Sequence, residues 1–234
     1  MKVLNKEIGD ELDSMYGLVA GRVAASGRDL VIEAYEGAGL SDVEWTDDAV
    51  IISLHQGVPT HALPHVLAVA LQHVRQTLDG YPHITEPDEP QPEGSDLVRS
   101  SLRELVLESD AEAQLVSLGL DRTWENEQRH QAMKGILKSP PADWNEPDSL
   151  GNLFIALQYA RMSLNHPPEM WKALQKRTEE VLPGAAERGE QALTAVKKRR
   201  WGNARNVLDS YVQLRDELGI EDLVKIEDAY GAQH

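Results

Sequence analysis

The stretch HVLAVALQHVRQTLDGYP, residues 65–82, decides how the rest of the chain is interpreted. Apolar residues recur there at spacings of three and four and cover a wide surface, which predicts a helix packed on several sides. The apolar positions are Leu63, Val66, Leu67, Val69, Ala70, Leu71, Val74 and Leu78. We expect Thr60 to cap the helix and Pro64 to lie in its first turn, where a missing N–H does least harm. Gly80 and Pro82 then end it.

Three short β-branched segments before this helix predict a small sheet. LVIEAYE (30–36) and AVIISLH (49–55) are expected strands, and a third is expected around residues 43–45. Upstream, apolar residues at three- and four-residue steps predict a helix over residues 4–23 that ends near Gly27. The front of the chain is therefore expected to mix helix and strand.

The segment TEPDEPQPEG, residues 85–94, is rich in proline and acid, which favours an extended, solvated connection. After it, periodic apolar runs predict helices until the short, ambiguous LVKIE at 223–227. The helical runs lie near residues 95–118, 122–138, 148–164, 168–181, 184–200 and 203–217. We therefore expect a helix-rich α+β protein with an N-terminal part (1–84), this connection, and a helical part (95–234) that completes the core and extends it.

Composition limits the classes of function. The formal net charge of -16, from 39 acidic and 23 basic residues, opposes non-specific binding to nucleic acid or to anionic membranes. Without cysteine there is no disulfide and no thiolate metal site, so a metal would need His, Asp or Glu ligands. The N-terminus is too charged for a signal peptide, and no run of about 18 apolar residues occurs. These features predict a cytoplasmic protein without a membrane partner.

Residues 69–73 occupy the register of a zinc-binding HExxH helix. In that motif two histidines four residues apart share a face and reach one metal, while the glutamate acts as a base toward metal-bound water. Here the five residues are Val69, Ala70, Leu71, Gln72 and His73. Val69 and Ala70 offer no lone pair to a metal and no group that can move a proton. We therefore expect no cofactor and assign no catalytic residue.

The order of helix, strand, strand and a His-bearing helix ended by GYP, followed by an acid-bearing helix, resembles the core of zincin-type metallopeptidases. The acids of the later helix are Glu104, Glu108, Asp110 and Glu112. The resemblance covers residues 1–120 and implies a zincin-like fold whose metal site has lost its chemistry. The remnant site that it implies consists of Val69, Ala70, His73 and, as a relic third ligand, Glu108.

Two other interpretations of the histidines stay open. His61 and His65 share a face able to chelate a metal if the helix already includes residue 61. His73 lies eight residues beyond His65, about 12 Å along the helix axis, and is too far away to join them. Alternatively, the helix is packed for reasons unrelated to an enzyme, and His73 is a core histidine hydrogen-bonded to a backbone carbonyl.

The run KKRRWGNAR, residues 197–205, places five cations around Trp201. These cations are Lys197, Lys198, Arg199, Arg200 and Arg205. They are enough for a phosphate-binding patch with an aromatic ring that stacks on a base. Because acids flank the run and the helix dipole favours cations near a C-terminus, we prefer a solvated helix face.

The sequence thus predicts a non-catalytic pseudo-metallopeptidase that acts as a protein- or peptide-interaction or regulatory module. No nucleophile elbow and no phosphate-binding loop is present. Two alternatives remain. One is a nucleic-acid-associated accessory protein that uses residues 197–205, and the other is a metal-dependent hydrolase with a site rebuilt at His61 and His65.

Overall fold

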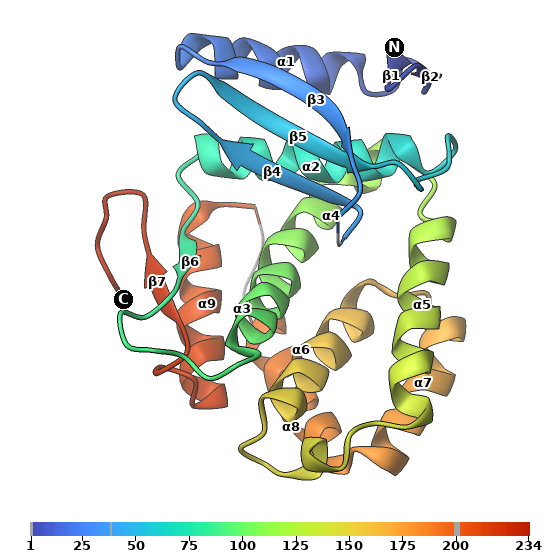
Figure 1. Ribbon diagram of the computed structural model, residues 1–234, viewed down its shortest axis with the longest axis vertical. Coiled ribbons are helices and arrows are strands. Elements are labelled where there is room, and N and C mark those ends of the chain that lie inside the picture. The colour runs from blue at the N-terminus through green and yellow to red at the C-terminus, as the bar shows by residue number, and fades with distance from the viewer. Residues whose placement is uncertain (1, 38, 199–201) are drawn as a thin grey trace. The chain divides into compact units, whose positions relative to one another are not determined.

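The computed structural model describes residues 2–37, 39–198 and 202–234. The architecture is α+β and helix-rich, as predicted (Figure 1). It divides into two compact units: unit 1 is Met1–Asp79 with Ala111–Glu125, and unit 2 is Gly80–Asp110 with Asn126–His234. Each unit therefore combines segments that are distant in the sequence. The sequence predicted that residues 85–94 connect an N-terminal part with a helical part. That division follows the order of the chain, whereas the two units do not, and it stays a prediction.

Unit 1 begins with a hairpin where a helix was predicted. β1 (Lys2–Val3) pairs antiparallel with β2 (Lys6–Glu7). Leu4 and Asn5 between them have φ values of 49° and 64°. Two successive positive φ values are those of a type I′ turn, which matches the twist of a hairpin. The helical prediction is therefore wrong at its start, and the first helix is α1 (Asp13–Ala25).

The three predicted strands of unit 1 are confirmed. β3 (Asp29–Tyr35) runs parallel to the central strand β5 (Ala49–His55), and β4 (Ser41–Trp45) runs antiparallel to it. Alternate residues of β5 are fully buried, namely Val50, Ile52 and Leu54. These residues share one hydrophobic cluster with α1 and α2 (Leu63–Leu78), so both helices cover this face of the sheet (Figure 1).

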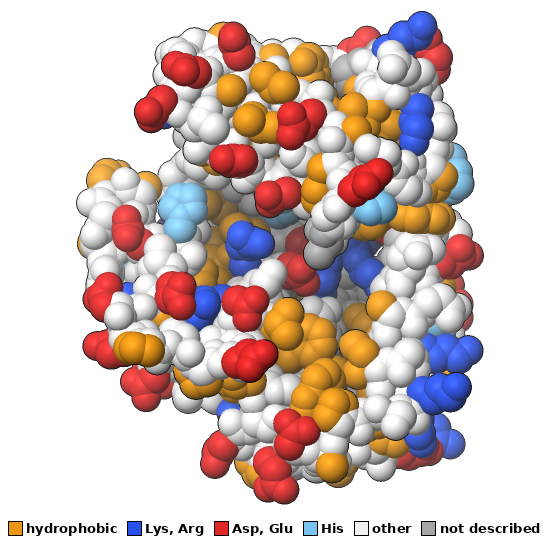
Figure 2. All heavy atoms as spheres, viewed as in Figure 1, with side chains coloured by type: hydrophobic (Ala, Val, Ile, Leu, Met, Phe, Trp, Pro, Cys, Tyr) orange, Lys and Arg blue, Asp and Glu red, His pale blue; other side chains and the backbone are white. Residues whose placement is uncertain are grey.

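The opposite face of the sheet carries exposed residues on β3 and β4. In Figure 2 acidic side chains surround a few apolar ones on this face, at the top of the view. Its exposed residues include Asp29, Val31, Glu33, Asp42 and Glu44. The alternation between apolar and charged faces follows from the period of two residues along a strand.

α2 matches its prediction with one correction. Pro64 lies in the first turn, and the helix ends just before Gly80, whose φ is 71°. Thr60 does not cap the helix, because the N-cap is Ala62 and no side chain caps it. The backbone N–H of Ala62 donates instead to the carbonyl of Pro59, which closes a turn before the helix starts.

The second segment of unit 1 contains the end of α4 (Ser109–Leu115), the short 3₁₀ helix η2 (Val116–Leu118) and the start of α5 (Thr123–Lys138). Gly119 ends η2 with a φ of 62°, in the left-handed region that glycine adopts without strain. Four side chains of this segment pack into the core of unit 1: Leu115, Leu118, Leu120 and Trp124. The boundaries between the units fall within α4 and α5.

Unit 2 is mainly helical. Its elements are α3 (Ser95–Arg103), the π-helical η1 (Glu104–Glu108), η3 (Ala142–Asn145), α6 (Leu150–Asn165), α7 (Pro168–Val181), α8 (Pro183–Lys197) and α9 (Ala204–Leu218), with parts of α4 and α5. The predicted single run at 95–118 is divided into four pieces, of which the second is π-helical. None of the helices described combines the length and the apolar character that crossing a membrane would require.

A short sheet joins distant parts of unit 2. The LVKIE segment, which the sequence left ambiguous, contains the strand β7 (Lys225–Glu227), and this strand pairs antiparallel with β6 (His83–Thr85), which was not predicted. Elsewhere in this unit α8 packs closely on α6. A Cβ atom added at Gly189 of α8 would lie 2.6 Å from Cδ1 of Tyr159 in α6, so this approach requires glycine.

Candidate functional site

His65 of α2 lies between two glutamates from the second segment of unit 1. Its Nδ1 is 2.5 Å from Oε1 of Glu125, and its Nε2 is 3.1 Å from Oε2 of Glu112. The three side chains are only 2–3% exposed. Both ring nitrogens are therefore occupied, each by a different carboxylate.

Arg122, whose side chain is 28% exposed, completes a charge cluster with these three buried residues. Its Nη2 lies 3.0 Å from Oε1 of Glu112. Burial by itself would lower the pKa of His65, but the hydrogen bonds with Glu112 and Glu125, and their negative charge, outweigh burial and raise it to about 9. At neutral pH both N–H groups of the imidazolium donate, and two cations balance two carboxylates. We call these four residues the His65 cluster.

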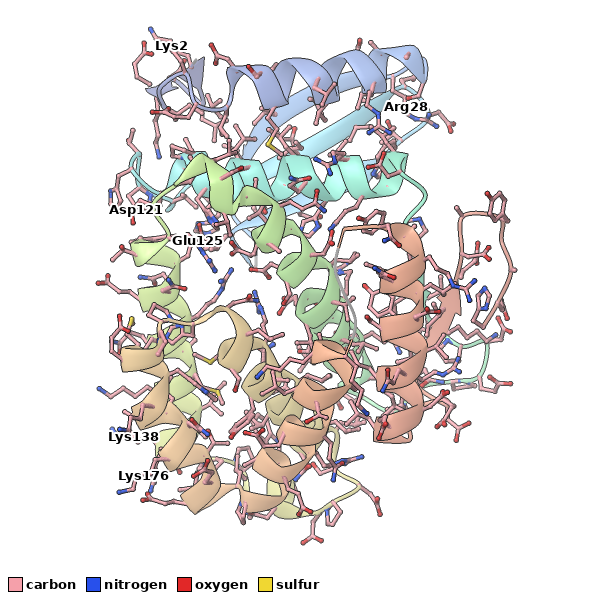
Figure 3. The ribbon with its side chains drawn as sticks, turned by 180° about the vertical axis from the view of Figure 1, so that it is seen from behind. Lys2, Arg28, Asp121, Glu125, Lys138 and Lys176 are labelled. Atoms are coloured by element: carbon pink, nitrogen blue, oxygen red, sulfur yellow. The ribbon has the colours of Figure 1, made fainter. Side chains whose placement is uncertain are left out.

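The start of α5 positions one side of this cluster. The backbone N–H of Thr123 donates to Oδ1 of Asp121 at 2.9 Å, and this hydrogen bond lowers the pKa of Asp121. Asp121 thus holds the first turn of α5, from which Glu125 reaches His65. In Figure 3 Asp121 and Glu125 lie at the start of α5, on the side of unit 1 where α2 begins. Glu112 comes from α4.

The His65 cluster does not fit a metal ion. Its two carboxylates lie at opposite nitrogens of the ring, so they cannot both join one nitrogen around a single ion. No group of three or more His, Asp or Glu residues suited to a metal occurs in the described ranges. α2 begins at Leu63, and His61 before it is exposed. The condition for His61 and His65 to share a helical face is therefore not met.

The α2 part of the predicted remnant site is apolar and packed. Val69 is 8% exposed, Ala70 is fully buried, and both belong to the core of unit 1. His73 is half-buried, and its Nδ1 lies 2.8 Å from Oε1 of Gln76. The interpretation of His73 as a core histidine hydrogen-bonded to a backbone carbonyl stays a prediction. A zinc ion does not fit here, because Val69 and Ala70 carry no donor atom.

Glu108, the predicted relic third ligand, belongs to unit 2. It lies in η1, where Arg129 donates to its Oε1 and Arg161 donates to its Oε2. Arg161 also donates to Oε2 of Glu104 at 2.5 Å. The carboxylate of Glu108 is therefore held by two guanidinium groups, and its role as a former ligand stays a prediction.

An open depression of about 650 Å³ lies in unit 1 beside the start of α2. Its apolar walls are Ile8, Pro64, Leu118 and Leu120. Its carboxylates are Glu7, Glu11 and Asp121. His61 also lines it, whereas no Lys or Arg appears among the described residues of its wall. We call this feature the acidic depression.

The predicted basic patch is described in part. Lys197 and Lys198 at the end of α8 are exposed, and so is Arg205 in α9, whose Nε lies 3.2 Å from Oδ1 of Asp209. Outside the described residues lie Arg199, Arg200 and Trp201. Binding of nucleic acid through this run stays a prediction.

Two residues of the His65 cluster, Arg122 and Glu125, were not found from the sequence. The signal that was available is His65 itself, which stands on an apolar face of α2, since a buried imidazole requires polar partners. Glu125 lies 60 positions away along the chain. Local patterns therefore indicate that a partner is needed but not which residue supplies it.

Function must be inferred from the His65 cluster, the acidic depression and the packed face of α2. Comparison of the chain with protein-family models, with curated proteins and with solved structures found no match.

Proposed function

We propose that the protein is a non-catalytic pseudo-metallopeptidase whose unit 1 binds a basic peptide segment of a partner protein in the acidic depression. The observation that carries this proposal is the lining of the depression, where three carboxylates accompany four apolar side chains. A peptide that presents Lys or Arg next to an apolar residue complements both features. A cytoplasmic location is part of the same proposal.

The chemistry of α2 supports the non-catalytic part. Hydrolysis by metal-bound water needs a set of ligands and a base. Val69 and Ala70 stand in that register as buried apolar residues, while His65 is closed on both sides by Glu112 and Glu125. In this proposal α2 serves as a scaffold that supports the neighbouring depression.

The size and charge of the acidic depression support the binding part. Its volume of about 650 Å³ falls within the range of about 300–1,000 Å³ that is usual for ligand sites. The hydrogen bond from the backbone N–H of Thr123 lowers the pKa of Asp121 and so favours its ionised form. Glu7 pairs with Lys2 at 3.2 Å, but both side chains are more than two-thirds exposed. An exposed ion pair contributes little, so an incoming cation can replace Lys2.

The peptide proposal is tested by selection from a random-peptide phage library on the immobilised full chain. We expect enriched sequences that combine Lys or Arg with aliphatic or aromatic residues. For a synthetic peptide of this kind, fluorescence anisotropy should show that the double variant Glu11→Gln/Asp121→Asn binds about tenfold more weakly. Asparagine at position 121 keeps an acceptor for the N–H of Thr123, so the start of α5 is preserved.

A matched control distinguishes the effect of carboxylates in the acidic depression from the effect of the protein's overall negative charge. Glu36→Gln/Asp47→Asn removes two exposed carboxylates from the same unit outside the depression. We expect this variant to change the affinity by less than about twofold, because salt screens distant charges. Equal weakening by both double variants would contradict the proposed site, and so would a selection that enriches no basic sequences.

Metal analysis tests the non-catalytic part. We expect protein equilibrated with zinc and then desalted to retain well under one equivalent, because one imidazole without further ligands is a poor zinc site. The replacements His73→Ala and His61→Ala should leave the zinc content unchanged. Plasma mass spectrometry provides the measurement. One equivalent of zinc that is lost on replacing either histidine would overturn the proposal.

A further inference from the structure

Unit 2 contains a cavity of about 220 Å³ between α5 and α6. Its apolar wall includes Met133 and Ile136 from α5 and Phe154 and Met162 from α6. Its polar wall includes Arg129, Arg161 and Asn126, and no carboxylate is among its described lining residues. The cavity is therefore apolar on one part and cationic on another, which suits an amphipathic anion.

The two arginines are held in fixed orientations. Glu108 accepts hydrogen bonds from Arg129 and Arg161, and Glu104 accepts one from Arg161. Neither glutamate lines the cavity. The side chain of Arg161 is 11% exposed, and its buried Nε–H has no acceptor among the described residues. Protein atoms cover this Nε–H, so a ligand reaches it only after a local movement of neighbouring side chains, but without breaking an existing ion pair.

Asn126 provides a second unsatisfied polar group. It lines the same cavity, is 7% exposed, and makes no hydrogen bond through its side chain within the described part of the chain. Buried amides are normally hydrogen-bonded, because leaving one unpaired costs the free energy of its desolvation. The Nε–H of Arg161 and the side-chain amide of Asn126 are therefore two hydrogen-bonding groups near one wall of the cavity that a ligand with an acceptor can use.

We propose that this cavity binds a small organic monocarboxylate with an aliphatic or aromatic body. The carboxylate accepts hydrogen bonds from the Nε–H of Arg161 and the amide of Asn126, and the body lies against the apolar wall. A dry cavity of about 150 Å³ accommodates benzene, so 220 Å³ accommodates a ring with one small charged substituent. Glu104 and Glu108 already balance the charges of Arg129 and Arg161, so each negative charge of a ligand depends on hydrogen bonds alone, and a second or third charge is disfavoured.

Phenylacetate, with phenylacetamide as its neutral counterpart, tests this site by isothermal titration calorimetry on the full chain. We expect phenylacetate to bind with a Kd of about 1 mM or lower, and phenylacetamide to bind at least about tenfold more weakly. In NMR spectra, the methyl signals of Met133 and Met162 should shift during the titration. Asn126→Asp places a negative charge inside the cavity and should weaken phenylacetate about tenfold or more.

Gln128→Glu is the matched control, because it adds the same charge at an exposed position of α5. It should change the affinity by less than about twofold. A thermal melt shows whether each variant remains folded, and Ala132→Leu, which fills the cavity without changing charge, provides a second route to loss of binding. Equal affinity for the acid and the amide, unshifted methionine signals, or no binding at millimolar concentrations would each overturn the proposal.

Discussion

Replacing His65 with leucine is expected to destabilise the protein by about 3–5 kcal/mol, because it leaves buried carboxylates without their shared cation. Glu112 and Glu125 are each 3% exposed, and after the replacement only Arg122 of the cluster remains to balance them. Leucine is close to histidine in volume, so the loss is not a cavity effect. Urea unfolding followed by circular dichroism at neutral pH provides the free energy of unfolding.

The His65 cluster makes the free energy of unfolding of the wild-type protein depend on pH, in a direction that follows from the pKa of His65. The pKa of His65 is raised from 6.5 to about 9 on folding, so folding favours its protonated form. The resulting stabilisation is fully present below pH 6.5 and is lost as the pH rises through about 9. The lost part is on the order of 3 kcal/mol. We expect this fall in the free energy of unfolding to be absent from His65→Leu.

A control replacement distinguishes the cluster from a general effect of removing histidine. His83→Leu changes an exposed histidine and should alter the free energy of unfolding by less than about 0.5 kcal/mol. Lowering the pH should also narrow the difference in the free energy of unfolding between wild type and His65→Leu, because protonation neutralises Glu112 and Glu125. An unchanged pH profile in His65→Leu would show that His65 is not the titrating group.

The second large effect is expected at the contact between α8 and α6. Gly189→Ala should destabilise the protein by about 1–3 kcal/mol, because inserting a methyl group overpacks the core. The new Cβ would lie 2.6–2.9 Å from atoms of Tyr159. Tyr159 cannot easily move away, because its hydroxyl donates to Glu190 at 2.7 Å and its ring meets Trp171 edge-on at 5.0 Å. Gly189→Val should destabilise it further.

Gly135 in α5 provides a control of opposite sign. A Cβ atom added there meets no atom within 4 Å. Gly135→Ala should therefore stabilise the protein by about 0.5–1 kcal/mol, since alanine loses less conformational freedom in a helix. Thermal and urea unfolding of both variants provide the comparison. If Gly189→Ala also stabilised the protein, the close packing against Tyr159 would be refuted.

Sequence patterns predicted the helices and strands whose apolar residues lie on one buried face. The short β-branched segment at residues 49–55 predicted the central strand, and three- and four-residue spacing predicted α6 to α9. The same spacing failed at Leu4, because a few apolar residues fit a helix and a hairpin equally well. Thr60 failed as a cap because a backbone turn at Pro59 satisfied the N–H groups instead.

Pairings between distant segments were beyond these patterns. The strand at residues 83–85 is defined by a partner about 140 positions later, and three residues carry too little local signal. The candidate site likewise combines features that the sequence indicated with a contact that it did not. The sequence indicated that Val69 and Ala70 provide neither a metal ligand nor a base in α2. The contact between Glu125 and His65 was found only from the fold.

The interrupted path of the chain through unit 1 has a consequence during translation. A nascent chain that has reached Asp79 already contains His65, but Ala111–Glu125 has not yet been made. At about 5–20 residues per second, the ribosome needs roughly 2–9 s to extend the chain from residue 79 to residue 125. During that interval His65 lacks both of its glutamate partners, so the His65 cluster can form only after residue 125 has been made.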